Sequence, residues 1–244
     1  MGTEKGIIYG LGLGPGDPEL MSVKSDRILR QSSNIAFFRK KGRKGHARSI
    51  VSKMLPANVV EFVMEYPVTT EISLDDPAYN QTLSEFYKDC AEHIKSLSEQ
   101  GTSVSVLCEG DPFFYGSFMH IYTRVKNSHP VEVVPAITGM SAAWTETGTP
   151  ITWGDDVLSV VMGTLPEEVL IAKMTQCDAL VVMKIGRHLK KVKRALKVSG
   201  LFGRAFIVRH AAMANSDIKK LSEIQEDIIP YFSVIIVHGQ GRRP

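Results

Sequence analysis

Short apolar runs alternate with longer amphipathic segments along the chain, a pattern typical of α/β proteins. The runs of the first half predict strands at residues 7–11, 34–38, 59–64, 103–108 and 131–135. Those of the second half predict strands at residues 158–162, 179–183, 205–208 and 233–237. Within the first half, residues 79–100 carry apolar side chains at three- and four-residue steps until Gly101, which predicts a long helix.

Residues 145–156, TETGTPITWGDD, are rich in turn formers and lack apolar periodicity. We therefore expect a domain boundary there, with an N-terminal α/β domain at residues 1–150 and a C-terminal α/β domain at residues 151–244. In open α/β sheets, ligands bind beyond the carboxyl ends of the strands. The loops that follow the predicted strands are therefore where functional residues are expected.

The first predicted strand runs directly into a glycine-rich loop, so that residues 7–17 read IIYGLGLGPGD. Glycine has no Cβ atom and lets backbone amides and carbonyls approach a ligand closely, so the loop suggests a nucleotide-like cofactor. It is not the dinucleotide fingerprint G-x-G-x-x-G, because Pro15 or Asp17 stands where the third glycine should be. The alternative is a tight turn from a strand into a helix.

Two further loops share this character. Residues 109–117, EGDPFFYGS, follow the fourth predicted strand: Gly110 allows close approach, Asp111 can accept hydrogen bonds from a ribose or fix the loop, and the aromatic side chains offer apolar walls. Residues 134–139, VPAITG, follow the fifth, where Thr138 can present a hydroxyl or cap a helix. Core packing and capping could explain each loop alone, but a cofactor cleft needs several such loops together.

The composition of the chain mainly argues against certain kinds of site and classes of protein. The 244 residues, 43% of them hydrophobic, suffice for a large core, and a net charge of +3 is too small to indicate nucleic-acid binding by itself. The 3 cysteines are widely separated, which argues against a disulfide framework or a structural zinc site, and the 7 histidines lack metal-ligand spacing. No apolar run approaches the roughly 20 residues that a membrane-spanning helix needs. We therefore expect no metal, no membrane partner and a cytoplasmic protein.

The segments LGLGPGDPELMSVKS, EGDPFFYGS and VPAITGMSAA, in this order, resemble the tetrapyrrole (corrin/porphyrin) methyltransferases that use S-adenosyl-L-methionine. The second-half segments MGTLPE at 162–167, VVMKIGRH at 181–188 and VRHAAM at 208–213 fit the same family and favour C20 of precorrin-2, in cobalamin biosynthesis, as the methylated carbon. The resemblance implies two α/β domains with the active-site trough between them, within a homodimer. A cobalt-bearing macrocycle or another ring position is the alternative inside the family.

The resemblance also implies a set of site residues. Those expected to contact the cofactor are Pro15, Glu109, Gly110, Asp111, Phe114, Thr138 and Gly139 in the first half, and Met183, Lys184 and Ala211 in the second. Arg39 and Tyr115 are expected to contact the tetrapyrrole. Because the activated methyl group carries the driving force, positioning is the main contribution expected of the protein. Glu109, Tyr115 or water could assist departure of the proton.

Two positions depart from the family pattern. Ala136 stands where relatives commonly have glycine, so the backbone there either avoids positive φ or tolerates strain. Arg39 stands where some relatives have an aspartate proposed as proton acceptor. We therefore transfer no catalytic base to that position.

Two groups of positive charge stand out. Residues 39–48, RKKGRKGHAR, contain six Lys or Arg, which could hold a substrate rich in carboxylates, contact RNA phosphates or belong to a solvated loop. The basic residues at 187–197 have the spacing of an exposed helix face, with Leu189, Val192 and Leu196 turned inward.

Three other functions stay open on the sequence. An NADP-dependent oxidoreductase could use Arg39 to bind a 2′-phosphate, although Pro15 and the GDPFFYG loop argue against it. An RNA methyltransferase of the same superfamily is disfavoured because no segment combines stacking aromatic residues with basic ones. A module that binds the cofactor without catalysis is the third.

Overall fold

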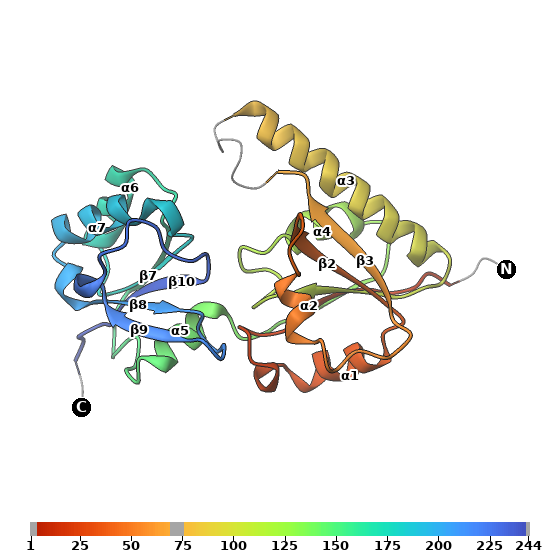
Figure 1. Cartoon of the computed structure of the whole chain (residues 1–244), viewed down its shortest axis with the longest axis horizontal. Coiled ribbons are helices and arrows are strands. Elements are labelled where there is room, and N and C mark those ends of the chain that lie inside the picture. The colour runs from red at the N-terminus through yellow and green to blue at the C-terminus, as the bar shows by residue number, and fades with distance from the viewer. Residues whose placement is uncertain (1–3, 69–75, 243–244) are drawn as a thin grey trace. The chain divides into compact units, whose positions relative to one another are not determined.

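The computed structural model describes residues 4–68 and 76–242, and the chain forms two compact units, Met1–Thr138 and Gly139–Pro244 (Figure 1). Each unit has its own five-stranded sheet, so the predicted α/β class is confirmed. The division lies earlier in the chain than the expected 150/151. The reason is helix α5 (Gly139–Glu146), whose Ala143 is buried among the second unit's Val181, Val208 and Ile236.

The sheet of the first unit is entirely parallel, with the order β3-β2-β4-β1-β5. Its strands are β1 (Ile8–Gly12), β2 (Asn34–Lys40), β3 (Val60–Tyr66), β4 (Val104–Cys108) and β5 (Val131–Val134). They match the predicted strands to within a residue or two at each end. Because all the strands are parallel, the loops that follow them leave from one edge of the sheet.

Helices cover both faces of this sheet (Figure 1). On one face lie α3 (Pro77–Glu99), the predicted long helix, and α4 (Phe118–Val125), and their buried side chains meet those of β1, β2 and β4. On the other face lie α1 (Val23–Gln31) and the short α2 (His46–Ile50). A 3-10 turn, η1 (Pro18–Leu20), joins β1 to α1, and Asp17 caps it by accepting a hydrogen bond from the Glu19 amide.

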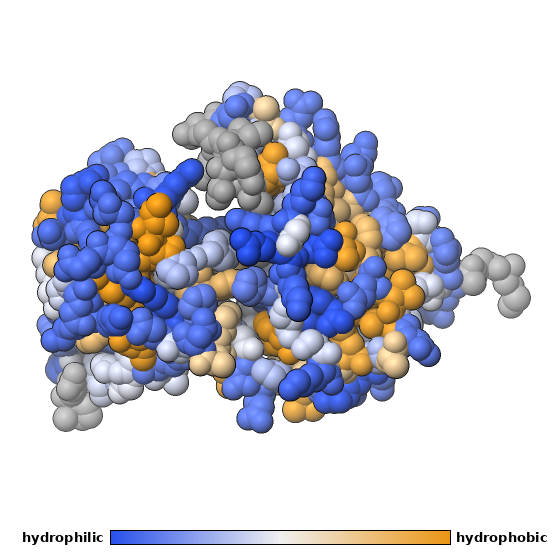
Figure 2. Space-filling model, in the orientation of Figure 1, coloured by the Kyte–Doolittle hydropathy of each residue, from blue (hydrophilic) through white to orange (hydrophobic). Residues whose placement is uncertain are grey.

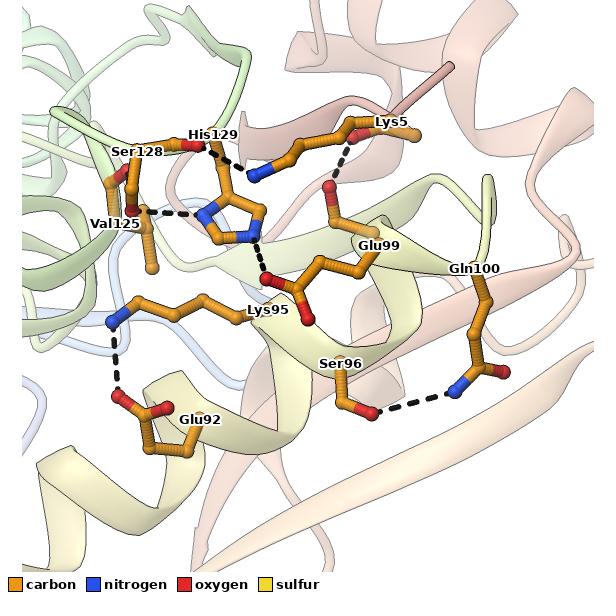
Figure 3. A network of polar contacts seen from close by, with 11 residues as sticks. Lys5, Glu92, Lys95, Ser96, Glu99, Gln100, Val125, Ser128 and His129 are labelled. Carbon is orange, nitrogen blue, oxygen red and sulfur yellow. Dashed lines mark hydrogen bonds and ion pairs between the residues drawn. The ribbon is translucent and has the colours of Figure 1, made fainter. Parts of the chain in front are cut away.

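A polar network closes the amino-terminal edge of the first sheet (Figure 3). The His129 ring lies 2.9 Å from Ser128 Oγ through Nδ1 and 3.5 Å from Glu99 Oε1 through Nε2. Lys5 Nζ donates to the Ser128 carbonyl at 3.0 Å. Burial is the main reason that the pKa of His129 is lowered, which favours its neutral form. The network ties the entry to β1, the end of α3 and the entry to β5 together at the edge opposite the glycine-rich loops.

The sheet of the second unit is mixed, with the order β6-β7-β10-β8-β9. Its strands are β6 (Leu158–Met162), β7 (Ala179–Met183), β8 (Ala205–Arg209), β9 (Asp217–Lys220) and β10 (Ser233–Val237). Since β6 is parallel to β7, and β10 is antiparallel to both β7 and β8, strands β6, β7 and β8 run in one direction. The edge strand β9, DIKK, was not predicted because its polar sequence lacks a strand pattern.

Helices α6 (Glu167–Thr175) and α7 (Leu189–Val198) cover one face of the second sheet, and α5 covers the other. The short turns η2 (Gly186–His188), η3 (Phe202–Arg204) and η4 (Leu221–Glu223) connect the elements. Helix α7 buries Leu189, Val192 and Leu196, as predicted for the basic group at 187–197. Its Lys190 and Arg194 form ion pairs with Asp227 and Glu167.

Two exclusions from the sequence can be checked against the described residues. Cys90, Cys108 and Cys177 are all free thiols, as the absence of a disulfide framework requires. Among residues 4–68 and 76–242, no helix is both long enough and apolar enough to cross a bilayer.

The glycines inside β1 are required by packing. A Cβ atom on Gly10 would lie 2.3 Å from Cε1 of the buried Phe118 ring. We expect Gly10→Ala to lower the free energy of unfolding by about 1–3 kcal/mol, because the buried ring would have to shift within a packed core. Urea denaturation measures the change. A Phe118→Leu substitution in the Gly10→Ala background should recover part of it, and equal, additive losses in the double variant would contradict the clash.

Candidate functional site

The three glycine-rich loops leave from neighbouring strands, because β1 lies between β4 and β5. The loops after β1 and β4 are hydrogen-bonded to each other: Leu13 N donates to the Cys108 carbonyl at 2.9 Å, and Gly110 N donates to the Gly14 carbonyl at 2.8 Å. Gly14 and Gly110 have φ of 77° and 63°, which side chains with a Cβ rarely adopt. The pair therefore needs glycine on both sides, and Pro15 lies buried next to it.

Asp111 connects the loop after β4 to the loop after β5. Its Oδ1 accepts from Phe113 N at 2.9 Å, and its Oδ2 accepts from Ala136 N at 3.0 Å. Of the two roles that the sequence left open for Asp111, fixing the loop is the one that these bonds describe. Ala136 is not among the described residues with positive φ, so its backbone avoids the strain that a missing glycine could have caused.

Glu109 occupies the half-buried position directly after β4. Burial raises the pKa of its carboxyl to about 7, although a hydrogen bond from the Ala47 amide at the start of α2 acts in the opposite direction. A carboxyl with this pKa exchanges a proton readily near neutral pH. The same hydrogen bond links the β4 loop to the segment that follows β2.

The aromatic residues of the β4 loop make two separate ring contacts. Phe113 packs edge-on against Tyr122 of α4, with ring centroids 4.7 Å apart, and Phe114 meets Tyr115 in a T-shaped contact at 4.9 Å. Tyr115 has a φ of 55° and is 46% exposed. Left-handed backbone at a non-glycine residue is costly and concentrates at functional sites. Tyr115 is therefore held at the surface by its loop, at the edge where ligands are expected.

The second unit places further strained residues beyond β7 and β8. Lys184 directly follows β7 with a φ of 52°, and His210 and Ala212 flank Ala211 after β8 with φ of 54° and 58°. Burial lowers the pKa of Lys184. Met183 and Ala211 both pack against the apolar cluster under α5. The residues expected from the resemblance thus sit at the carboxyl ends of strands in this unit as well.

Glu146, at the end of α5, fixes the loop after β8. Its two carboxylate oxygens accept hydrogen bonds from Ala212 N and Ser216 Oγ. Sequence reasoning missed Glu146, His210 and Ala212. Nothing in one sequence marks an alanine or histidine as left-handed, and the partners of Glu146 are distant in the chain.

Thr138 and Gly139 lie where the two units join in sequence, after β5 and at the first residue of α5. A Cβ on Gly139 would meet nothing within 4 Å, so this glycine is open on its Cβ side. The substrate candidate Arg39, near the end of β2, forms an ion pair with Glu65 of β3, with 3.0 Å between Nε and Oε2. Across residues 4–68 and 76–242, no group of three or more His, Cys, Asp or Glu side chains could hold a metal ion.

Comparison with known proteins identifies the family of this chain and several similar proteins. The model of the tetrapyrrole (corrin/porphyrin) methylases matches residues 7–225. A precorrin-2 C(20)-methyltransferase from Sinorhizobium sp. is 44% identical over 243 residues, which are 100% of this chain and 99% of that protein. A cobalt-precorrin-2 C(20)-methyltransferase from Salmonella typhimurium is 27% identical over 240 residues, covering 96% of this chain and 97% of that one.

The fold also matches a solved structure. The uroporphyrin-III C-methyltransferase from Thermus thermophilus, complexed with S-adenosyl homocysteine, superposes with a TM-score of 0.68 at 20% identity, over 96% of this chain and 97% of that one. At this identity the match concerns the fold.

Removing the Asp111 carboxylate should loosen the loops after β4 and β5. We expect Asp111→Ala to lower the free energy of unfolding by about 1–3 kcal/mol, because the amides of Phe113 and Ala136 both lose their acceptor. Asp111→Asn should lose less, since its amide oxygen can keep one bond. Urea denaturation tests this, with the exposed Asp89→Asn as control. Equal stability of Asp111→Ala and the wild type would refute the role.

The raised pKa of Glu109 predicts a pH-dependent stability. Between the ordinary value of 4.5 and about 7, the folded protein holds a proton that the unfolded chain releases, so stability falls as pH rises through this range. Glu109→Gln stays neutral and should be more stable than the wild type at pH 8, by up to about 3 kcal/mol, with little difference at pH 5. Thermal unfolding at both pH values measures this. The exposed Glu19→Gln is the control, and a difference independent of pH would contradict the shift.

Proposed function

Because the chain belongs to the tetrapyrrole (corrin/porphyrin) methylases, we propose that it transfers the methyl group of S-adenosyl-L-methionine to C20 of precorrin-2 in cobalamin biosynthesis. The single observation that carries this proposal is 44% identity, over the whole chain, to a protein with that name. The linked loops after β1, β4 and β5 support it, since they offer backbone groups and apolar walls for a cofactor at one sheet edge.

The cofactor contacts in this proposal come from both units. In the first unit they are Pro15, Glu109, Gly110, Asp111, Phe114, Thr138 and Gly139. In the second they are Met183, Lys184 and Ala211. Asp111 acts by holding the loops, because its carboxylate oxygens already accept two backbone amides. The other first-unit residues bind mainly through backbone groups and apolar surfaces.

The reaction mainly needs C20 of the substrate to be aligned with the methyl group of the cofactor. An electron pair at C20 forms a bond to the methyl carbon, and the carbon–sulfur bond breaks with its electrons remaining on sulfur, which gives S-adenosylhomocysteine. The C20–H bond then breaks, and its electrons restore conjugation in the ring. Glu109 is our candidate to receive that proton, because a pKa of about 7 suits proton exchange near neutral pH. Tyr115 and water are the other candidates.

The metal-free macrocycle is the preferred substrate. The Sinorhizobium relative named for precorrin-2 is 44% identical, whereas the Salmonella relative named for cobalt-precorrin-2 is 27% identical. The cobalt-bearing ring is the second candidate.

We further propose that the enzyme is a homodimer and that it acts in the cytoplasm. Sedimentation of the purified protein tests the dimeric state.

Labelled cofactor distinguishes these possibilities. We expect S-adenosylhomocysteine to bind the purified protein in calorimetry, and precorrin-2 with ¹³C-methyl S-adenosylmethionine to give a singly methylated product. ¹³C NMR locates the label, and mass spectrometry compares the metal-free and cobalt-bearing rings. Label at a carbon other than C20 would refute the assigned position. Label in RNA with none in the tetrapyrrole would refute the substrate.

A further inference from the structure

The basic run at residues 39–48 divides into two sets. The flanking Arg39 and Arg48 are ion-paired with Glu65 and Glu61 of β3, at 3.0 and 2.7 Å. The cations between them are exposed and form no ion pair with any residue in the described ranges 4–68 and 76–242. They are Lys40, Lys41, Arg43 and Lys44, and we call residues 40–44 the cationic turn.

A backbone hydrogen bond closes the cationic turn. Arg43 N donates to the Lys40 carbonyl at 3.0 Å, and Gly42 between them has a φ of 67°, so these residues form a hydrogen-bonded turn. Gly45 then packs closely against Phe37, since a Cβ on it would lie 2.7 Å from Cδ2 of that ring. The charged side chains therefore project from a hydrogen-bonded turn, and a turn that is already formed lowers the entropic cost of binding.

The cationic turn lies beside the candidate cofactor loops. It follows β2, which is the neighbour of β4 in a parallel sheet, so it leaves from the same edge as the loops after β1, β4 and β5. Ala47, just beyond the turn, donates its amide to Glu109 of the β4 loop. The segment that continues from the turn therefore lies against the end of β4.

The charge of the cationic turn is large for this protein. The whole chain has a net charge of only +3, and residues 39–48 contain no carboxylate. Figure 2 shows strongly hydrophilic side chains gathered over the segment that follows β2. Such a concentration of one sign attracts polyanions and raises their rate of association.

We propose that the cationic turn binds the peripheral carboxylates of the tetrapyrrole substrate. This inference rests on the proposed function and names how that substrate is recognised. Arg43 can form a forked pair with a carboxylate, and the lysines supply mobile point charges around it. An RNA ligand fits less well, because residues 39–48 contain no Phe, Tyr or Trp side chain on which a base could stack, and His46 supplies their one aromatic ring.

The test compares two variants that remove equal charge. The first is K40Q/K41Q/R43Q/K44Q. The control is K88Q/K126Q/K173Q/K197Q, which neutralises exposed lysines on helices or directly after one. We expect the turn variant to lose about 10- to 100-fold in kcat/KM for precorrin-2, mainly through KM, with a weaker dependence on salt. Its affinity for S-adenosylhomocysteine should stay at the wild-type value, and the control should behave as wild type.

A binding measurement separates this inference from the proposed function. Uroporphyrin carries a carboxylate on every peripheral substituent, and its methyl ester carries none, so fluorescence titration with both isolates the acid groups. The turn variant should bind uroporphyrin more weakly and the ester unchanged. That result would sustain the inference even if no methyl transfer occurred. Unchanged uroporphyrin affinity, an equal loss in the control variant, or a loss confined to single-stranded RNA would overturn it.

Discussion

The candidate site depends on the hydrogen bonds that join the loops after β1, β4 and β5. The Gly14 carbonyl and the Gly110 amide connect the first two loops, and the Asp111 carboxylate connects the second to the Ala136 amide of the third. Without these bonds, the loops would leave the sheet edge as independent flexible segments, and a cofactor would have to order them on binding. A parallel sheet brings the loops to one edge, and the bonds between them make that edge a preorganised surface.

The opposite edge of the same sheet is closed by a different kind of contact. There, the buried His129, Lys5 and Glu99 hold the entries to the strands together (Figure 3). These side chains use their polar groups on one another and on backbone carbonyls. The two edges therefore differ in chemistry: at one, side-chain polar groups contact one another and a backbone carbonyl, and the other offers glycines, exposed aromatic rings and the exposed cations of residues 40–44. This asymmetry places ligand binding at the carboxyl edge on grounds of physical chemistry.

Most strands were predictable because at least one of their faces is buried, and buried positions are occupied by apolar residues in a recognisable pattern. Strand β9 could not be predicted, because an edge strand of Asp, Ile and Lys has no such apolar pattern. The end of the first unit was also out of reach: α5 joins the second unit through the burial of Ala143, a contact with residues far along the chain. The glycine-rich loops could be recognised, but the role of Asp111 as a link between loops required knowing that β5 lies beside β1. The left-handed backbone at Lys184, His210 and Ala212 had no signal in the sequence, and at Ala212 it accompanies a hydrogen bond to Glu146, which is distant in the chain.

In the first unit, the buried carboxyl of Glu109 contrasts with the exposed positive charges of the cationic turn. The pKa of Glu109 is governed by burial and by one backbone amide, so at neutral pH the carboxyl is partly protonated and carries less negative charge than an ordinary glutamate. Arg39 and Arg48 are neutralised by carboxylates of β3 and serve to anchor the segment between them. The four cations of the cationic turn are exposed and form no ion pair within residues 4–68 and 76–242, and a backbone hydrogen bond closes the turn that carries them. A partner that carries many carboxylates around a flat apolar ring would match both features at once, because its acid groups could meet the cations while its ring meets the aromatic and glycine-lined loops.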